Sequence, residues 1–244
     1  MVPRFFIAKE NMDPAKAIVT GKDAHHLIHV LRKKIGDKLE IIDSQANCYQ
    51  AEITKIEDEK VTCKLIEKKK SKNELPVKVT LFQCLPKHKK MDFIIEKCTE
   101  LGATQIIPVV SERSIPKLDA DKAAKKVTRW NEIARSAAEQ SGRATLPTVA
   151  SPISFAEAIK QGSFDLKVIP WETEGRNSLK KILKEYPQIK NIAVYIGPEG
   201  GFSHAEIELA KNQNIFPVTL GPRILRTETA GIYILSSLSY ELEL

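Results

Sequence analysis

The chain has 244 residues, a formal net charge of +7, 42% hydrophobic and 28% charged residues. This balance is typical of a folded globular protein and excludes disorder of the whole chain. No apolar run reaches the ~18 residues of a membrane-spanning helix, and the opening residues MVPRFFIAKE lack the apolar core of a signal peptide, so we expect a cytoplasmic protein without membrane contact. The excess positive charge favours an anionic partner without identifying it.

The first part of the chain is typical of a small β-domain. Short segments rich in apolar and β-branched residues predict strands at residues 4–8, 38–44, 48–56 and 60–67. One helix is predicted at 23–34. This pattern indicates a small barrel or sandwich. Residues 1–72 hold fifteen Lys and Arg against eleven Asp and Glu, or +4, so more than half of the chain's net charge lies here. A small basic β-domain of this kind is typical of nucleic-acid-binding modules. A solvated surface with surplus lysines would give the same charge pattern.

A lysine-rich stretch at 67–76, EKKKSKNELP, indicates a linker, so we predict domains at 1–72 and 73–244. Beyond it, strand and helix patterns alternate. Strands are predicted at 77–85, 104–110, 166–172, 192–196 and 216–220, and helices at 89–102, 119–141, 154–162, 178–186, 203–213 and 229–242. This alternation predicts an α/β domain with a mostly parallel sheet covered by helices.

Cysteine and histidine residues give no metal or redox signature. The four cysteines, at 48, 63, 84 and 98, include no C-x-x-C pair, so buried, reduced thiols are expected. His25 and His29 stand four apart, a spacing that two metal ligands can share. Since no third ligand and no H-E-x-x-H motif accompany them, no metal is predicted.

Three loops that leave apolar strands share proline and glycine: IPWE at 169–172, IGPEGG at 196–201 and LGPRILRTETA at 220–230. Ligands of open α/β sheets bind at the carboxyl ends of strands, where these loops should converge. Ser203 and Glu206 form a capping box, which predicts a helix directly after the glycines. The glycines match neither G-x-G-x-x-G nor a P-loop, and no lysine follows them. A purine-ribose ligand with a positive centre therefore fits better than a triphosphate, although tight turns and a solvated helix start would need the same residues.

These motifs resemble one known family. IGPEGGFSHAE followed by LGPRILRTETA is similar to the C-terminal signature of the ribosomal RNA small subunit methyltransferase E family, which methylates uridine at N3 in 16S ribosomal RNA. KMDFIIEKCTELGATQIIPVVSERS, RWNEIARSAAEQSGRATLPTV and HHLIHVLRKKIGDKLEIID also resemble segments of that family. The resemblance therefore covers most of the chain.

The resemblance implies a fold and a cofactor. It implies a SPOUT-type α/β methyltransferase domain with a deep trefoil knot, preceded by a PUA-like β-barrel that binds RNA. It also implies S-adenosyl-L-methionine as the methyl donor and a homodimer packed through the knotted domain. By motif match, the expected cofactor-binding residues are Gly197, Pro198, Glu199, Gly200, Gly201, Leu220, Gly221, Ile224, Leu225 and Arg226. The IPWE loop is expected to form a third wall, with Pro170, Trp171 and Glu172.

For catalysis, a cation should stabilise the charge that develops on the uracil ring as N3 loses its proton. Arg226 is the candidate, with Arg223 as second choice or as a phosphate contact. The sequence does not identify the general base. Glu199 and Glu228 are near enough to be considered, but each has another role that would explain it. Small-subunit ribosomal RNA is the expected partner, with the assembled subunit favoured as the substrate and naked RNA left open. Its expected contacts are Arg4, Arg32, Lys33, Lys34, Lys87, Lys89 and Lys90.

Two other functions fit the same sequence. One is a related methyltransferase that acts on a ribose 2′-oxygen or on another base. The other is a catalytically silent RNA-binding factor for ribosome assembly. The intact glycine and arginine motifs favour an enzyme over the silent factor.

Overall fold

The computed structural model describes residues 2–69, 73–88, 90–114, 119–175 and 177–243. The chain divides into two compact units. Unit 1 comprises residues 1–74 together with 138–146, and unit 2 comprises 75–137 and 147–244. Segment 138–146, at the end of the long helix, thus belongs with the N-terminal part of the chain.

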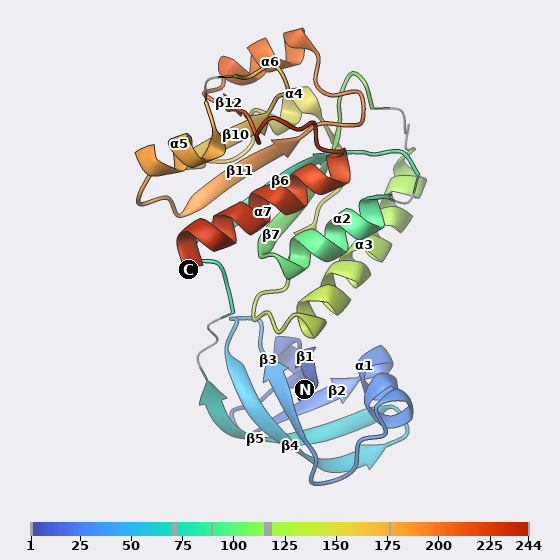
Figure 1. Ribbon diagram of the computed structural model, residues 1–244. Helices are drawn as coiled ribbons and strands as arrows, with labels where there is room; N and C mark the ends of the chain where they lie inside the picture. Colours follow the sequence, from blue (N-terminus) through green and yellow to red (C-terminus); the bar gives the residue numbers. More distant parts are fainter. Residues whose placement is uncertain (1, 70–72, 89, 115–118, 176, 244) are drawn as a thin grey trace. The chain divides into compact units, whose positions relative to one another are not determined.

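Unit 1 is built on a curled sheet (Figure 1). Its described strands are β1 (Arg4–Phe6), β2 (Lys16–Thr20), β3 (Lys38–Ile42), β4 (Cys48–Glu57) and β5 (Lys60–Lys69), in the order β1-β3-β4-β5-β2. β1 pairs with β3 in parallel, and the other pairs are antiparallel. A 3₁₀ turn, η1 (Lys9–Asn11), precedes β2. Alternate strand residues, among them Leu39, Ile41, Ile53 and Val61, form its core.

Two predictions for unit 1 were wrong in detail. Residues 16–20 form a strand that the sequence analysis missed, because only three apolar residues stand between polar turns. The helix predicted at 23–34 is shorter: α1 (Gly21–His25) continues as one π-helical turn, η2 (His26–Val30). Arg32 has a φ of 50°, in the left-handed region, so the helix cannot continue through it.

Among the described residues, unit 2 contains a seven-stranded sheet in which every pairing is parallel. The order is β12-β10-β11-β6-β7-β8, and β9 also pairs with β7. The strands are β6 (Lys78–Cys84), β7 (Ala103–Val110), β8 (Thr148–Val149), β9 (Ile153–Ser154), β10 (Leu166–Pro170), β11 (Asn191–Ile196) and β12 (Phe216–Val218). This confirms the predicted α/β class with a mostly parallel sheet.

Helices cover both faces of this sheet (Figure 1). The helices are α2 (Lys90–Glu100), α3 (Ala120–Gln140), α4 (Phe155–Ala158), α5 (Leu179–Glu185), α6 (His204–Lys211) and α7 (Thr227–Glu243). Side chains of α2, α3, α5 and α7 pack in one core with Val79 and Leu81 of β6. Side chains of α4 and α6 pack in a second core with Phe82 and Cys84. The alternation along β6 is the period of a strand buried on both faces.

All four cysteines are buried free thiols, as predicted. Burial raises the pKa of Cys63, Cys84 and Cys98 to about 12, so these thiols stay protonated at neutral pH. Within the described part of the chain, none of the helices combines the length and apolar character that crossing a membrane requires.

Candidate functional site

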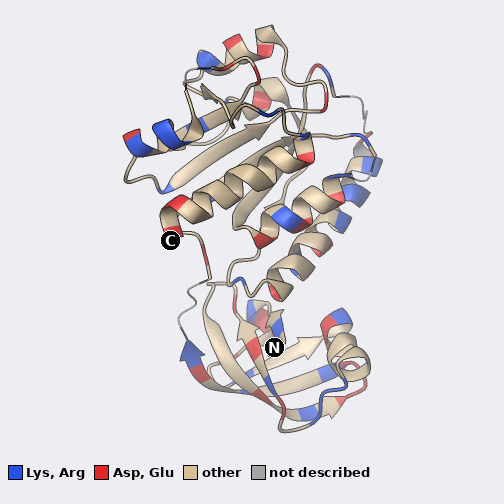
Figure 2. Ribbon diagram, viewed as in Figure 1, with Lys and Arg blue, Asp and Glu red and all other residues tan. Residues whose placement is uncertain are grey.

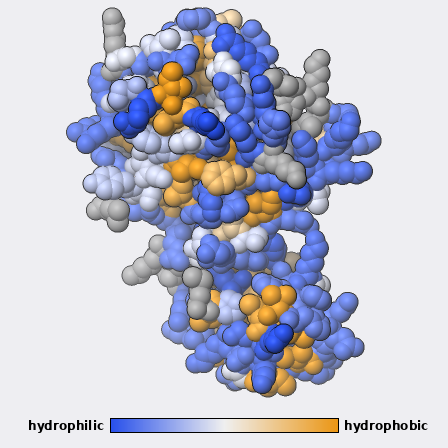
Figure 3. All heavy atoms as spheres, turned by 45° about the vertical axis from the view of Figure 1, so that its right-hand side comes forward, coloured by the Kyte–Doolittle hydropathy of each residue, from blue (hydrophilic) through white to orange (hydrophobic). Residues whose placement is uncertain are grey.

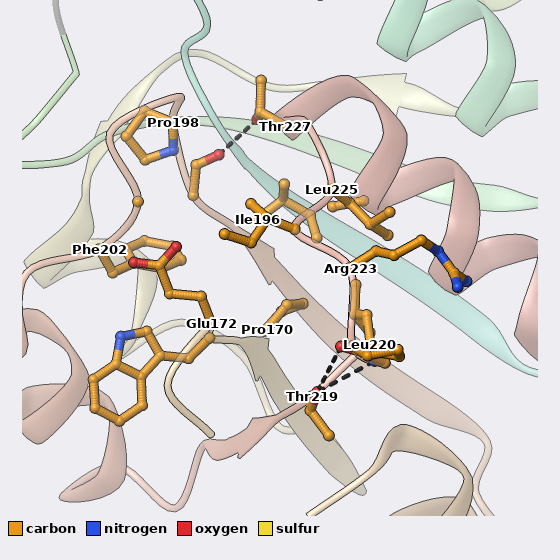
Figure 4. Close-up of a pocket in the computed structure, with 17 residues that line it drawn as sticks. Pro170, Glu172, Ile196, Pro198, Phe202, Thr219, Leu220, Arg223, Leu225 and Thr227 are labelled. Atoms are coloured by element: carbon orange, nitrogen blue, oxygen red, sulfur yellow. Dashed lines mark hydrogen bonds between the residues drawn. The ribbon is translucent and has the colours of Figure 1, made fainter. Parts of the chain in front are cut away.

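The three proline- and glycine-containing loops meet in one pocket of unit 2 (Figure 4). They follow β10, β11 and β12, which are parallel neighbours, so their carboxyl ends lie at the same edge of the sheet. The Trp171 amide donates to the Val218 carbonyl at 3.0 Å and holds the loop after β10 against the end of β12. The pocket is lined by Pro170, Trp171, Glu172, Ile196, Gly197, Pro198, Gly201, Phe202, Thr219, Leu220, Gly221, Pro222, Arg223, Ile224, Leu225, Thr227 and Ala230.

Two positions of the pocket require glycine, because their backbone conformation disfavours a side chain. Gly201 has a φ of 66° and Gly221 a φ of 109°, conformations that other residues adopt rarely or with strain. A Cβ atom placed on either would meet no protein atom within 4 Å. Open space therefore lies beside the backbone at both positions. A ligand can approach the main chain closely there.

Thr227, the first residue of α7, connects the pocket to the sheet. Its hydroxyl donates to the Gly197 carbonyl at 2.6 Å (Figure 4). The same hydroxyl accepts from the Gln83 Nε2 at 2.9 Å. Gln83 is the penultimate residue of β6 and is fully buried, and its side-chain amide also donates to the Cys84 carbonyl. One buried hydroxyl thus joins the β11 loop, the start of α7 and the end of β6.

The structure brings most of the expected cofactor residues together. Ten of them line the pocket: Pro170, Trp171, Glu172, Gly197, Pro198, Gly201, Leu220, Gly221, Ile224 and Leu225. Arg223, expected as a second catalytic choice, also lines it, although its side chain extends away from the cavity (Figure 4). Glu199, Gly200 and Arg226 are not among the lining residues.

Glu199 and Gly200 have other partners. The Glu199 carboxylate lies 3.1 Å from the Lys90 Nζ and accepts from the Lys87 amide, also at 3.1 Å. Arg113 Nη1 donates to the Gly200 carbonyl at 2.8 Å. Burial alone would raise the pKa of Glu199, but hydrogen bonds from its own backbone, from Lys90 and from Lys87 leave it below 4.5. The carboxylate is therefore ionised at neutral pH.

Six lining residues were missed by sequence reasoning: Ile196, Phe202, Thr219, Pro222, Thr227 and Ala230. All six stand inside or beside the recognised motifs. Ala230 follows Thr227 by three residues, so helical spacing could have placed both on one face of α7. Phe202 was harder to predict from the sequence, because an apolar aromatic side chain also fits the core. It packs against Phe155 in the second core and borders the pocket as well.

The expected RNA-contacting residues differ in exposure. Arg32 and Lys34 are exposed in unit 1, and Lys33 is half-buried. Val30 and Ile35 beside them are also exposed, and Figure 3 shows apolar residues gathered among hydrophilic ones on this unit. Arg4 is engaged instead: its guanidinium pairs with Glu40 at 2.6 Å and donates to the Arg143 carbonyl, and only 10% of its side chain is exposed.

In unit 2, Lys87 is exposed and Lys90 is half-buried, whereas Lys89 lies outside the described residues. Sequence reasoning overlooked a further basic surface. The N-terminal half of α3 is rich in Lys and Arg (Figure 2). Its exposed members are Lys122, Lys125, Lys126 and Arg129.

Family models match nearly the whole chain. An RNA methyltransferase domain matches residues 73–239, and an RNA methyltransferase PUA domain matches residues 19–66. The chain is 38% identical to the ribosomal RNA small subunit methyltransferase E of Bacillus subtilis, over 99% of this chain and 97% of that protein. It is 35% identical to the protein of the same name from Synechocystis, over all of this chain and 79% of that one.

Solved structures agree with this. The small subunit methyltransferase E of Neisseria gonorrhoeae, solved with S-adenosyl methionine bound, has a TM-score of 0.89 and 33% identity, over 99% of this chain and 98% of that one. A methyltransferase of Legionella pneumophila, in complex with the cofactor SAM, has a TM-score of 0.87 and 30% identity over the same shares.

Proposed function

Because the chain belongs to the ribosomal RNA small subunit methyltransferase E family, we propose that it methylates N3 of a uridine in small-subunit ribosomal RNA, with S-adenosyl-L-methionine as methyl donor. The observation that carries the proposal is the pocket in which the two loops of the C-terminal family motifs meet the IPWE loop at 169–172. Two similar structures contain this cofactor. The enzyme class rests on the whole-chain similarity, and the N3 position on the resemblance of the two C-terminal motifs.

The pocket suits the cofactor chemically. Ile196, Leu220 and Leu225 provide apolar walls for a purine ring. The open backbone at Gly201 and Gly221 offers amides and carbonyls to ribose and purine edges. Glu172 is the acidic residue among those lining the pocket, and it offers a negative charge to a cationic ligand. When bound, the cofactor supplies an electrophilic methyl group on a sulfonium.

The chain's own residues then have to position the uridine. Methyl transfer needs N3 in line with the methyl group, and such positioning can lower a barrier by ~7 to 11 kcal/mol. N3 must also lose its proton, which leaves negative charge on the ring and its carbonyl oxygens. Arg226 and Arg223, both exposed at the β12 loop, are the proposed cations for this charge. Arg226 is the first choice, and Arg223, which lines the pocket, is the second.

Substituting Arg226 tests this role. Arg226→Ala should lower kcat by about a hundredfold or more, as for loss of a group that stabilises developing charge, while the affinity for the cofactor stays within a few-fold. Arg226→Lys should recover part of kcat, because it keeps the charge but not the planar donor pair. Turnover kinetics and calorimetry measure the two effects. If Arg226→Ala keeps full turnover and Arg223→Ala abolishes it, the roles are exchanged.

The RNA is proposed to contact unit 1 through Arg32, Lys33 and Lys34, and unit 2 through Lys87 and Lys89. We also propose that the substrate is the assembled subunit, that the enzyme is a cytoplasmic homodimer and that the C-terminal segment of unit 2 is knotted. Exposed Tyr233 and Tyr240 on α7 support an interface there. The hydrogen bonds of Thr227 with Gln83 of β6 and with Gly197 in the loop after β11 support a threaded C-terminal segment.

The deciding experiment is transfer of labelled methyl from S-adenosyl-L-methionine to small ribosomal subunits that lack the modification. Naked ribosomal RNA and bulk transfer RNA serve as parallel substrates. We expect label in the subunits, mapped to N3 of one uridine. Label on a ribose 2′-oxygen or on another base would replace the N3 assignment. Absence of label together with absence of cofactor binding would favour a silent assembly factor.

A further inference from the structure

Three charged side chains from three separate elements meet next to the pocket. Lys90 is the first residue of α2, and its Nζ lies 3.1 Å from Glu199 Oε1 and 3.2 Å from Glu228 Oε2. Glu199 belongs to the glycine loop after β11, and Glu228 is the second residue of α7. We call Lys90, Glu199 and Glu228 the clasp. One ammonium group therefore bridges two segments that both border the pocket.

The surroundings favour an ordered contact. The side chains of Lys90, Glu199 and Glu228 are 30%, 26% and 17% exposed, so solvent screens them less than it screens a surface pair. Glu199 also accepts from the Lys87 amide, which fixes the carboxylate from a second direction. At the next residue of the glycine loop, Arg113 donates to the Gly200 carbonyl. The loop is thus held at two adjacent residues.

The clasp acts on the pocket through its neighbours in the chain. Pro198 and Gly201, on either side of Glu199 and Gly200, line the pocket, and so does Thr227, which precedes Glu228. None of the three clasp residues lines it. We propose that Lys90 is a positioning residue, which keeps the glycine loop and the start of α7 at the separation that the cofactor requires. This inference rests on the proposed function, because it takes the pocket as the cofactor site.

A different role was expected for Lys90 from the sequence, namely a phosphate contact. The two roles predict different losses. A phosphate contact would affect the KM for RNA and its salt dependence and leave cofactor affinity unchanged. A positioning residue affects cofactor affinity in the absence of RNA. Glu199, similarly, would act on the cofactor through the loop geometry and not by contact.

The chain offers a matched control in Lys97. It lies two turns further along α2, its side chain is 34% exposed, and its Nζ also pairs with two carboxylates, Glu96 and Glu100, each at 2.7 Å. Both partners belong to α2 itself. Lys90→Met and Lys97→Met therefore remove the same charge, from the same helix, at similar exposure, and only the first breaks a link between elements.

The test is calorimetry with S-adenosyl-L-methionine in the absence of RNA, together with steady-state kinetics. For Lys90→Met we expect a Kd raised about tenfold, as two partly buried ion pairs can supply. Lys97→Met should stay within twofold of the wild type, and Lys90→Arg should restore most of the affinity. In Lys90→Met the KM for the cofactor should rise more than kcat falls.

Several outcomes would overturn the inference. Equal cofactor affinity in Lys90→Met and Lys97→Met is one, and a rise confined to the KM for RNA is another. If Lys90→Met proves unstable in thermal unfolding, Glu228→Gln serves as the test instead. It removes only the ion pair between Lys90 and Glu228 and should raise the Kd for the cofactor by a smaller factor. A wild-type protein that binds no cofactor would contradict the proposed function, which is a distinct result.

Discussion

At the residue scale, a few buried polar groups decide the geometry of the site. Thr227 is only 5% exposed, yet its hydroxyl both donates and accepts across three elements. A buried donor or acceptor without a partner costs more than the average hydrogen bond contributes. The Gly197 carbonyl and the Gln83 amide therefore depend on one oxygen atom, which restricts the residue at position 227 to a hydroxyl-bearing side chain.

Thr227→Val removes that oxygen and keeps the shape of the side chain. We expect a loss of about 1 to 3 kcal/mol in the free energy of unfolding, because two buried groups lose a partner. Urea denaturation measures it. Thr128→Val is the control, since its hydroxyl is exposed and donates to the Ala124 carbonyl of its own helix. It should change stability by less than about 0.5 kcal/mol. Equal effects of the two substitutions would contradict the assigned role.

The clasp also predicts a pH dependence. Hydrogen bonding to Glu199 and Glu228 raises the pKa of Lys90 above 10.5, while the pKa of Glu199, despite its burial, is lowered below 4.5. The Glu199 contribution is present above pH 4.5 and disappears as pH falls through its lower folded-state pKa. The Lys90 contribution is present below pH 10.5 and disappears as pH rises through its higher pKa. The difference in thermal stability between wild type and Lys90→Met should therefore be constant between pH 4.5 and pH 10.5, and it should shrink at lower and at higher pH. A steady change of this difference across neutral pH would contradict the prediction.

At the scale of elements, the close approach of α7 to α2 depends on a glycine inside α7. A Cβ at Gly231 would lie 3.3 Å from the Cys98 sulfur and 3.7 Å from Gln83 Oε1. Glycine inside a helix costs roughly 0.5 to 1 kcal/mol relative to alanine. The packing of α7 over α2 and β6 accounts for its presence here. Thr227 and Glu228 at the start of the same helix depend on that packing for their position.

Substitution at Gly231 separates helix propensity from packing. Gly231→Val should lower the free energy of unfolding by about 1 to 3 kcal/mol through overpacking against Cys98. Gly231→Ala is the comparison: its single Cβ needs only a small shift of the sulfur, and the gain in helix propensity offsets part of the cost. Urea midpoints measure both. If valine is tolerated as well as alanine, α7 and α2 do not require the close contact.

At the scale of the whole molecule, unit 1 is completed by a segment from the far end of α3. Glu74 accepts hydrogen bonds from Arg143 Nη2, the Ala144 amide and the Thr145 amide. Arg143 is 2% exposed, and Arg4 donates to its carbonyl. Burying a guanidinium is costly unless it is paired. These bonds explain why segment 138–146 belongs to unit 1, although most of α3 belongs to unit 2.

Glu74→Ala tests this link between sequence-distant segments. We expect a loss of about 2 to 3 kcal/mol, because a buried cation loses a charged partner and two amides lose an acceptor. Hydrogen exchange at the Ala144 and Thr145 amides should become faster at the same time. Glu67→Ala is the control, since Glu67 is exposed and its carboxylate makes a long ion pair with Lys69, at 3.9 Å. Unchanged protection of the two amides in Glu74→Ala would contradict the assignment.

Much of this protein follows from the order of its residues. Periods of two and 3.6 residues predict the helices and the longer strands of unit 2, but not its two-residue strands β8 and β9. The run GPEGG with Ser203 and Glu206 predicts a turn followed by a capped helix, which the structure confirms. These features are local, because they depend on groups a few residues apart. The family motifs are also contiguous, and for that reason they could be recognised without a structure.

Only the tertiary structure decided which side chains of those motifs face the pocket. Glu199 lies within the glycine motif, yet its carboxylate meets Lys90, which is 109 positions away in the chain. Thr227 bonds Gln83 across 144 positions, and Arg143 bonds Glu74 across 69. Local conformation sets where a loop begins and ends. The direction of each side chain in it is set by the partners that folding brings into range, because a buried charge or donor is stable only where such a partner lies.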